Sequence, residues 1–287
     1  MDGFVVINKP SGVTSFSVTG AVKRKTGVRR CGHAGTLDPL ASGVLPVMVG
    51  RATRLIDLID DNQKVYRAGV VFGLTTDTLD CEGKVLTDQP TENLTREKIE
   101  DALENFKGEI EQIPPMYSAV KKDGVKLYDL ARKGIEVDRK PRIVTVFDIK
   151  LLEFDGEDFA ELLITCSKGT YVRTFIVDLG VDLGCGAFMC SLVREKGSSF
   201  TLSDAIDLDE FLQKDLSETL LPPDRAVDFP KVFVTENQAT RFSNGGELDF
   251  TRVNLPEDSV YYRVYHADKF LGVGVKKETA LFPKCVF

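Results

Sequence analysis

The sequence predicts a mixed α/β protein with a small β-rich region at its C-terminal end. After Thr95, apolar residues follow the spacing of one helix face. Short apolar runs near 259–265, 270–275 and 280–287 are typical of strands. Between residues 64 and 74, apolar side chains recur at every second position, as on one face of a strand: Tyr66, Ala68, Val70 and Phe72.

The first 60 residues alternate strands and helices. Residues 3–8 form an apolar run that predicts a strand. Ser15 is then expected to cap a helix over residues 16–26 that ends at Gly27, because serine is favoured at helix starts and glycine just after their ends. A buried strand and a short helix are expected next, at residues 44–49 and 52–59.

The middle of the chain adds a second helical stripe and a hairpin. Thr95 is expected to cap a helix that stops at Gly108 and serves structural packing. Asp155-Gly156 is a hairpin signal between strands near 142–154 and 158–166. From Thr170 a helix follows, with Arg173 at the edge of its apolar face. A strand near 188–194 and a short acidic helix near 205–213 complete this part.

Two domains are expected, joined by the proline-rich stretch at residues 221–224. The first, residues 1–225, contains a basic insertion at residues 117–142 whose weak apolar periodicity predicts only a helical turn or two. The second, residues 229–287, is expected to be small and β-rich.

Composition excludes several classes of protein. With 43% hydrophobic and 28% charged residues, the chain fits a globular rather than a disordered protein. Its six cysteines form no Cys-x-x-Cys pair and only two histidines are present, so we expect no metal site. The first apolar run, residues 4–7, is too short for a signal core or a membrane span, so we expect reduced thiols in a cytoplasmic protein.

Charge is distributed unevenly. Residues 1–54 carry eight Lys or Arg against two Asp, and residues 121–142 carry eight against four acidic residues, which gives +6 and +4. The whole chain carries −7, so the remaining residues carry −17. This asymmetry is typical of one basic face on an acidic body, which attracts a phosphate backbone; solvated helix faces are the alternative.

The most informative stretch is residues 32–46, Gly-His-Ala-Gly-Thr-Leu-Asp-Pro-Leu-Ala-Ser-Gly-Val-Leu-Pro. Asp38 is its only acid. The following proline disfavours the helical conformation for Asp38, and the flanking glycines allow tight turns close to a ligand. Asp38 is therefore a candidate nucleophile, although an Asp-Pro turn that only bonds its own backbone has the same residues.

This stretch resembles the catalytic signature of the TruB family of tRNA pseudouridine synthases. Further segments resemble the family in the same order along the chain, and the resemblance is strong over residues 3 to 200 and fades after that. The matching segments are Asn8-Lys9-Pro10, Lys64-Val65-Tyr66-Arg67, Thr76-Asp77-Thr78-Leu79-Asp80, Pro114-Pro115-Met116-Tyr117-Ser118-Ala119, Lys126-Leu127-Tyr128 and Ser167-Lys168-Gly169-Thr170-Tyr171-Val172-Arg173.

The resemblance implies a fold and a set of site residues. The fold is the pseudouridine synthase fold, with an extended mixed, mostly antiparallel sheet and a small PUA-like C-terminal domain. Asp38 would be the nucleophile, Arg173 its cationic partner, and Tyr66 would lie against the flipped base. Further substrate-binding residues are His33, Tyr171, Leu192, Lys9 and Lys64. For Tyr66 and Leu192 core packing is the alternative, for His33 a structural role, and for Arg173 a plain surface position. Lys9 is expected to buttress the active loop.

The function implied is isomerisation of the T-loop uridine at position 55 of tRNA to pseudouridine. The reaction needs one ionised carboxylate aimed at ribose or base, and it requires no cofactor or metal. The expected partner is the T-arm stem-loop of tRNA, with no membrane and no protein partner, and the chain is expected to be a monomer. Alternatives are the catalytic subunit of a guide-RNA pseudouridylation complex and a non-catalytic tRNA-folding module.

Overall fold

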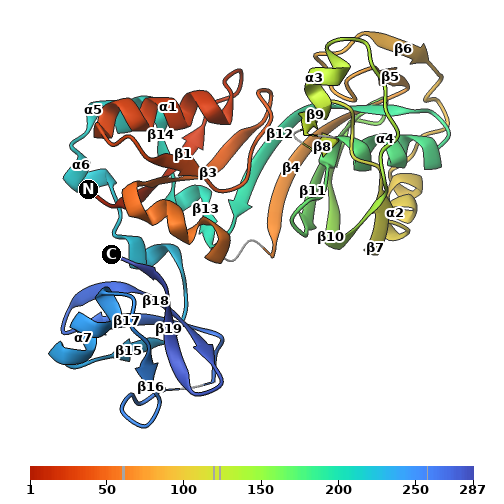
Figure 1. The fold of residues 1–287 in the computed structure, drawn as a ribbon. Helices are drawn as coiled ribbons and strands as arrows, with labels where there is room; N and C mark the ends of the chain where they lie inside the picture. Colours follow the sequence, from red (N-terminus) through yellow and green to blue (C-terminus); the bar gives the residue numbers. More distant parts are fainter. Residues whose placement is uncertain (60–61, 119, 123, 257) are drawn as a thin grey trace. The chain divides into compact units, whose positions relative to one another are not determined.

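The computed structural model describes residues 1–59, 62–118, 120–122, 124–256 and 258–287 (Figure 1). The chain divides into two compact units. The first comprises Met1–Asp38, Val44–Asp60 and Ser203–Phe287, and the second comprises Pro39–Gly43 and Asp61–Leu202. The chain thus crosses between the units on both sides of the segment that follows Asp38.

The N-terminal part of the first unit is a small mixed sheet with helices. Strand β1 lies between β14 and β3, parallel to β14, and β2 pairs antiparallel along β3. Buried side chains of β1, β3, helix α1 and Phe211 form one core cluster. The elements are β1 (Gly3–Lys9), α1 (Ser15–Thr26), β2 (Cys31–His33), β3 (Ser42–Val49), the 3-10 segment η1 (Gly50–Leu58), β14 (Ile206–Asp207), α5 (Leu208–Gln213), α6 (Leu216–Thr219) and η3 (Pro223–Ala226).

A five-stranded sheet closes the first unit, in the order β15-β17-β18-β19-β16. It has a core cluster of its own, centred on Tyr262, Val264 and Phe242. The predicted β-rich C-terminal region is therefore present. Its elements are β15 (Lys231–Phe233), α7 (Glu236–Ser243), β16 (Leu248–Asp249), β17 (Tyr261–His266), β18 (Lys269–Lys277) and β19 (Ala280–Val286).

The second unit is built on the strand order β12-β4-β11-β10-β7, whose pairs are all antiparallel. The first residues of β3, Ser42 and Gly43, add a parallel pairing to β12. Helices α2 and α4 pack on this sheet (Figure 1). The elements are β4 (Lys64–Phe72), β5 (Leu74–Thr76), β6 (Val85–Asp88), α2 (Arg96–Glu104), β7 (Gly108–Gln112), β10 (Arg142–Phe154), β11 (Phe159–Cys166), α4 (Val172–Asp182), β12 (Ala187–Gly197), β13 (Phe200–Thr201) and η2 (Leu202–Asp204).

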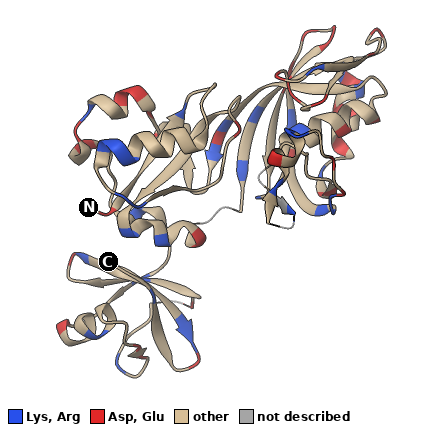
Figure 2. Cartoon of the chain, turned by 45° about the horizontal axis from the view of Figure 1, so that its top comes forward, with Lys and Arg blue, Asp and Glu red and all other residues tan. Residues whose placement is uncertain are grey.

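The basic insertion, residues 117–142, has little regular structure. It contains the short pair β8 (Lys121–Lys122) and β9 (Val125–Lys126) and one helix, α3 (Leu127–Ala131), where one or two helical turns were expected. Figure 2 shows Lys and Arg on this segment, and both signs of charge on the C-terminal sheet. None of the helices in the described residues is long and apolar enough to cross a membrane.

Most predicted elements are confirmed, but one cap and one helix end are wrong. Helix α2 ends at Glu104 and not at Gly108, which instead begins strand β7. The mixed α/β class, the hairpin through Asp155-Gly156 and the C-terminal strands are present. Helix α1, however, is capped by Thr14, whose hydroxyl accepts from the Ser17 N–H at 3.0 Å, and not by Ser15. Ser15 is the first helical residue because its hydroxyl is engaged elsewhere, by the backbone of Leu37.

Candidate active site

Asp38 lies in the turn between β2 and β3, and the start of helix α1 holds this turn. The Ser15 hydroxyl donates to the Leu37 carbonyl and accepts from the Leu37 N–H, both at 2.9 Å. Ser15 and Leu37 are buried, whereas Asp38 is half-buried. The residue immediately before the candidate nucleophile is therefore fixed by a buried two-way hydrogen bond, and the carboxylate keeps access to solvent.

Two glycines of the motif are required by local geometry. Gly35 has φ of 76°, in the left-handed region that favours glycine. At Gly43, with φ of 103°, a side chain would collide with the backbone of Arg194 on β12. The motif glycines thus permit the turn and the close approach of β3 to β12.

His33 ends the strand before this turn, and Lys9 ends strand β1 of the same unit. The Thr19 hydroxyl donates to the Ser15 carbonyl, so the His33 Nδ1, 3.0 Å away, is assigned as the donor to Thr19. Lys9 is fully buried, and its ammonium donates to the carbonyls of Pro10 at 2.8 Å and Val13 at 2.6 Å. These contacts hold the segment between β1 and helix α1, and a buttressing role of Lys9 towards the active loop stays a prediction.

Tyr66 and Leu192 share one face of the sheet in the second unit. Tyr66 on β4 pairs with Arg194, and Ala68 pairs with Leu192 on β12, so the four side chains point to the same side. Tyr66 and Leu192 are 7% and 8% exposed. The period-two prediction for β4 is confirmed. Lys64, at the start of β4, is also buried.

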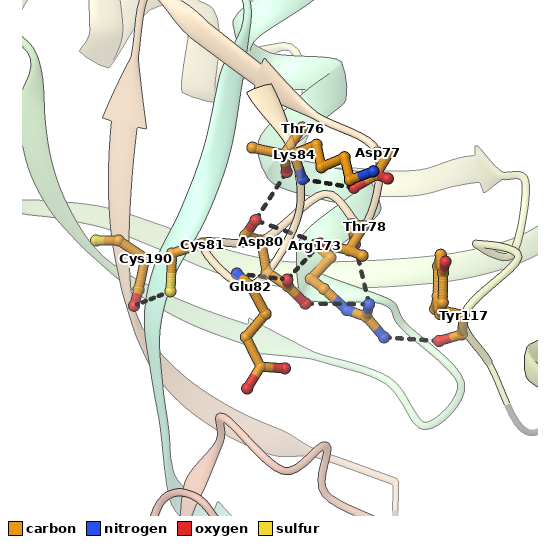
Figure 3. Close-up of polar contacts among 10 residues, drawn as sticks. All are labelled: Thr76, Asp77, Thr78, Asp80, Cys81, Glu82, Lys84, Tyr117, Arg173 and Cys190. Carbon is orange, nitrogen blue, oxygen red and sulfur yellow. Dashed lines mark hydrogen bonds and ion pairs between the residues drawn. The ribbon is translucent and has the colours of Figure 1, made fainter. Parts of the chain in front are cut away.

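Tyr171 and Arg173 lie at the start of helix α4. Tyr171 is the residue that precedes the helix, and it is half-buried. Arg173 is buried, and Figure 3 shows its guanidinium between two loops. It donates to the carbonyls of Thr78 at 3.0 Å and Tyr117 at 2.8 Å and pairs with the Asp80 carboxylate at 3.2 Å.

Asp80 is the polar partner that the sequence interpretation did not single out. Both side chains of the Arg173–Asp80 pair are 6% exposed. The second carboxylate oxygen of Asp80 accepts from the Thr78 hydroxyl at 2.6 Å and the Glu82 N–H at 3.1 Å (Figure 3). A carboxylate with an arginine and two further donors is stabilised in its buried position.

The backbone beside Asp80 is unusual as well. Leu79 has φ of 66°, which is rare for a bulky residue and is found where surrounding structure enforces it. Asp80 could have been identified from its position in residues 76–80, one of the segments that resemble the TruB family, where an acid directly follows an apolar residue.

The predicted catalytic residues are distributed over both units. Asp38, His33 and Lys9 belong to the first, whereas Tyr66, Arg173 and the remaining candidates belong to the second. Pairing of Asp38 with Arg173 therefore stays a prediction. In the described ranges, no three His, Cys, Asp or Glu side chains come together in a way that could hold a metal ion.

Comparison with solved structures identifies similar folds. A chain of a Cbf5-Nop10-Gar1 complex is 25% identical and matches with a TM-score of 0.76, over 99% of this chain and 84% of that one. A chain of an H/ACA ribonucleoprotein bound to a substrate RNA containing 2′-deoxyuridine is 23% identical, with a TM-score of 0.74 over 99% and 84% of the two chains. The overall fold is therefore that of these chains.

Sequence comparison covers nearly the whole chain. The TruB family profile for the N-terminal domain of pseudouridylate synthases matches residues 23–172, and the profile for the C-terminal region of pseudouridine synthase II TruB matches residues 230–287. Proteins named tRNA pseudouridine synthase B are similar as well. That of Clostridium perfringens is 40% identical over 97% of this chain and 96% of its own length. That of Dehalococcoides mccartyi is 43% identical over 97% and 93%. With two family profiles and such relatives over almost its full length, the chain belongs to the TruB family of pseudouridine synthases.

Proposed function

We propose that this chain is a tRNA pseudouridine synthase that isomerises the T-loop uridine at position 55. The curated relatives named tRNA pseudouridine synthase B support the substrate class. The observation that carries the proposal is Asp38, the single acid of the family motif, half-buried in a turn that Ser15 holds in place.

The reaction rearranges bonds within one nucleotide. The bond between N1 of the base and C1′ of the ribose breaks, the base turns, and a bond between C5 and C1′ forms. C5 loses a proton and N1 gains one, so atoms and electrons balance without a cofactor. Asp38 acts as the nucleophile, so that breaking of the N1–C1′ bond and formation of the C5–C1′ bond occur as two separate steps.

Asp38, Tyr66 and Arg173 supply the chemistry in this proposal. The arginine is the cation that keeps a carboxylate ionised in a desolvated pocket, since an unpaired buried charge is costly. Tyr66 lies against the base, on a strand face that is already buried. Its hydroxyl is the group suited to move the proton at C5.

The target base must leave its stack to reach these groups. Tyr171 and Leu192 offer a stacking ring and an apolar wall for the extruded base. His33 takes the space that the nucleotide vacates. Lys64 completes the substrate-binding set, and Lys9 maintains the loop through its bonds to Pro10 and Val13.

RNA binding is assigned to the basic parts of the chain. The basic insertion carries +4 over residues 121–142, and residues 1–54 carry +6, which favours contacts with phosphates of the T-arm. Residues 1–225 then form the catalytic domain, and residues 229–287 a PUA-like RNA-binding domain. The enzyme acts in the cytoplasm as a monomer without a protein partner.

Substitution of Asp38 by Asn tests the nucleophile. We expect Asp38→Asn to abolish turnover in a single-turnover assay on T-arm RNA with no added partner. Its affinity for the RNA should stay within about threefold of wild type, because phosphate contacts supply most of the binding free energy. The matched control is Asp209→Asn, at an exposed acid of the same unit, which should leave turnover unchanged.

Two results would contradict the proposal. Turnover of Asp38→Asn within about tenfold of wild type would exclude Asp38 as the nucleophile. Activity that appears only with a guide RNA and added protein would favour a subunit of a guide-RNA complex, and tRNA refolding without pseudouridine would favour a tRNA-folding module.

A further inference from the structure

Gln112 is a buried polar side chain that the reaction scheme does not use. It is the last residue of β7 and is 1% exposed. Its carboxamide bonds the backbone of Tyr171, 59 positions away in sequence, in both directions. The Oε1 accepts from the Tyr171 N–H at 3.0 Å, and the Nε2 donates to the Tyr171 carbonyl at 3.3 Å.

We call these two hydrogen bonds the Gln112 clamp. The clamp holds Tyr171, the residue that precedes helix α4. Tyr171 precedes the helix with φ of −99° and ψ of 105°, and no side chain caps the helix there. The carboxamide thus fixes both backbone polar groups of Tyr171. The direction in which the Tyr171 ring leaves the chain depends on this backbone, since the rotamers available to a side chain depend on φ and ψ.

Two neighbouring contacts join the same two parts of the chain, the segment after β7 and the start of helix α4. The Thr174 hydroxyl lies 3.5 Å from the Ile113 carbonyl, and Arg173 donates to the Tyr117 carbonyl at 2.8 Å. The segment from Gln112 to Tyr117 therefore contacts three of the first four residues from Tyr171 onward. Gln112 is the buried end of this segment. Its side chain bonds both the N–H and the carbonyl of a single backbone residue, Tyr171.

We propose that Gln112 is a positioning residue for the reaction, which fixes Tyr171 so that its ring is ready for the extruded uridine. The proposal rests on the proposed function, in which Tyr171 contacts that base. A carboxamide suits this position because it offers one acceptor and one donor at the same end. A carboxylate offers acceptors only, and a thioether offers neither group in useful strength.

Two substitutions test the clamp. We expect Gln112→Met to lower the single-turnover rate at saturating T-arm RNA by at least about tenfold, with Kd within about threefold, because a misplaced contact costs rate after binding. Gln112→Glu should be impaired at neutral pH and recover relative to wild type as the pH falls, because a protonated carboxyl again offers a donor and an acceptor. Matched controls are Gln89→Met and Gln89→Glu, at an exposed glutamine of the same unit.

A double-mutant cycle separates positioning from general stability. If Gln112 acts through the Tyr171 ring, Gln112→Met should change the rate by less than about twofold when Tyr171→Ala is already present. Additive losses in the cycle would overturn the proposal, as would a pH dependence of Gln112→Glu equal to that of wild type. Melting temperatures check that each variant is folded, and Gln112→Glu serves if Gln112→Met does not fold.

The wild-type chain distinguishes the two levels of inference. Active wild type with a Gln112→Met rate within about twofold overturns the clamp alone. Wild type without turnover on T-arm RNA overturns the proposed function and the clamp together.

Discussion

Two arginines of the second unit pair with carboxylates in contrasting surroundings. Arg67 on β4 has two partners, Glu161 at 2.8 Å and Glu195 at 2.7 Å, and all three side chains are between 27% and 40% exposed. Arg173 pairs with Asp80 at the longer distance of 3.2 Å, but both side chains are 6% exposed. The shorter ion pairs are thus the ones nearer to water.

This difference shows that the solvent exposure of an ion pair determines how much its loss costs in stability. Around Arg67, water screens the charges, so each exposed pair contributes at most about 1 kcal/mol to stability. The hydrogen bonds that Arg67 donates to Glu195 and Glu161 raise the pKa of its guanidinium, a group that is charged at neutral pH in any case. Around Arg173, removal of one partner leaves a buried charge uncompensated, which costs about 3–5 kcal/mol.

The largest expected effect is that of Arg173→Met. It should lower the single-turnover rate by about 100-fold or more, since a preorganised charge is lost, and lower the free energy of unfolding by about 3–5 kcal/mol. Rapid-quench assays and urea denaturation measure the two effects. Arg67→Met is the matched control, and equal losses in both variants would remove the distinction between the clusters.

Asp80→Asn should have a smaller effect. The amide keeps the size of the side chain and one acceptor, and Arg173 keeps its bonds to the carbonyls of Thr78 and Tyr117. We expect a loss of roughly 1–3 kcal/mol in the free energy of unfolding and a reduced rate. The control is Asp77→Asn at an exposed neighbour that accepts from the Lys84 N–H. A rate for Asp80→Asn equal to that of the control would show that the carboxylate charge is dispensable.

Arg67→Met itself removes two exposed pairs and should change stability by no more than about 2 kcal/mol. The change should shrink further in high salt, because exposed charges are screened within a few ångströms there. Urea denaturation of both proteins at low and high salt measures this. A salt-independent loss above that size would show that the Arg67 cluster is effectively buried.

A further effect, which depends on pH, is expected at Asp178, on the same helix as Arg173. Burial raises its pKa from an ordinary 3.8 to about 6. The folded protein therefore binds this proton more tightly than the unfolded chain, so the contribution of Asp178 to stability is largest below about pH 4 and is lost as the pH rises through about 6. Asp178→Asn should remove this dependence and raise the melting temperature at neutral pH. Melting curves across this pH range test it, and an unchanged pH dependence would contradict it.

Local patterns in the sequence were sufficient for the long strands and most helix ends, but not for short strands such as β2, β5, β6, β7 and β15. The alternation around Tyr66 predicted its buried face, and Asp155-Gly156 predicted the hairpin, because both depend on neighbours in sequence. Ser15 and Thr14 are both good caps, and only the tertiary bond from Ser15 to Leu37 decides between them.

The site was less predictable, since its contacts join distant segments. Arg173 was expected to pair with Asp38, and the structure adds Asp80 as a buried partner, 93 positions away. Gln112 carries no motif signal either, because a glutamine at the end of a strand has many roles. Residue types indicate which residues are candidates for the site. Which side chains pair with one another depends on how distant loops come together around helix α4.

The bond from Arg173 to the Tyr117 carbonyl has a thermodynamic consequence. Residue 117 opens the basic insertion, so whatever moves this segment also changes the environment of the guanidinium. Such coupling is reciprocal. If ordering of the insertion changes the binding free energy of an anionic group beside Arg173, then binding of that group changes the free energy of ordering the insertion by the same amount. RNA without the target uridine should then leave hydrogen exchange of residues 124–142 faster than RNA that contains it.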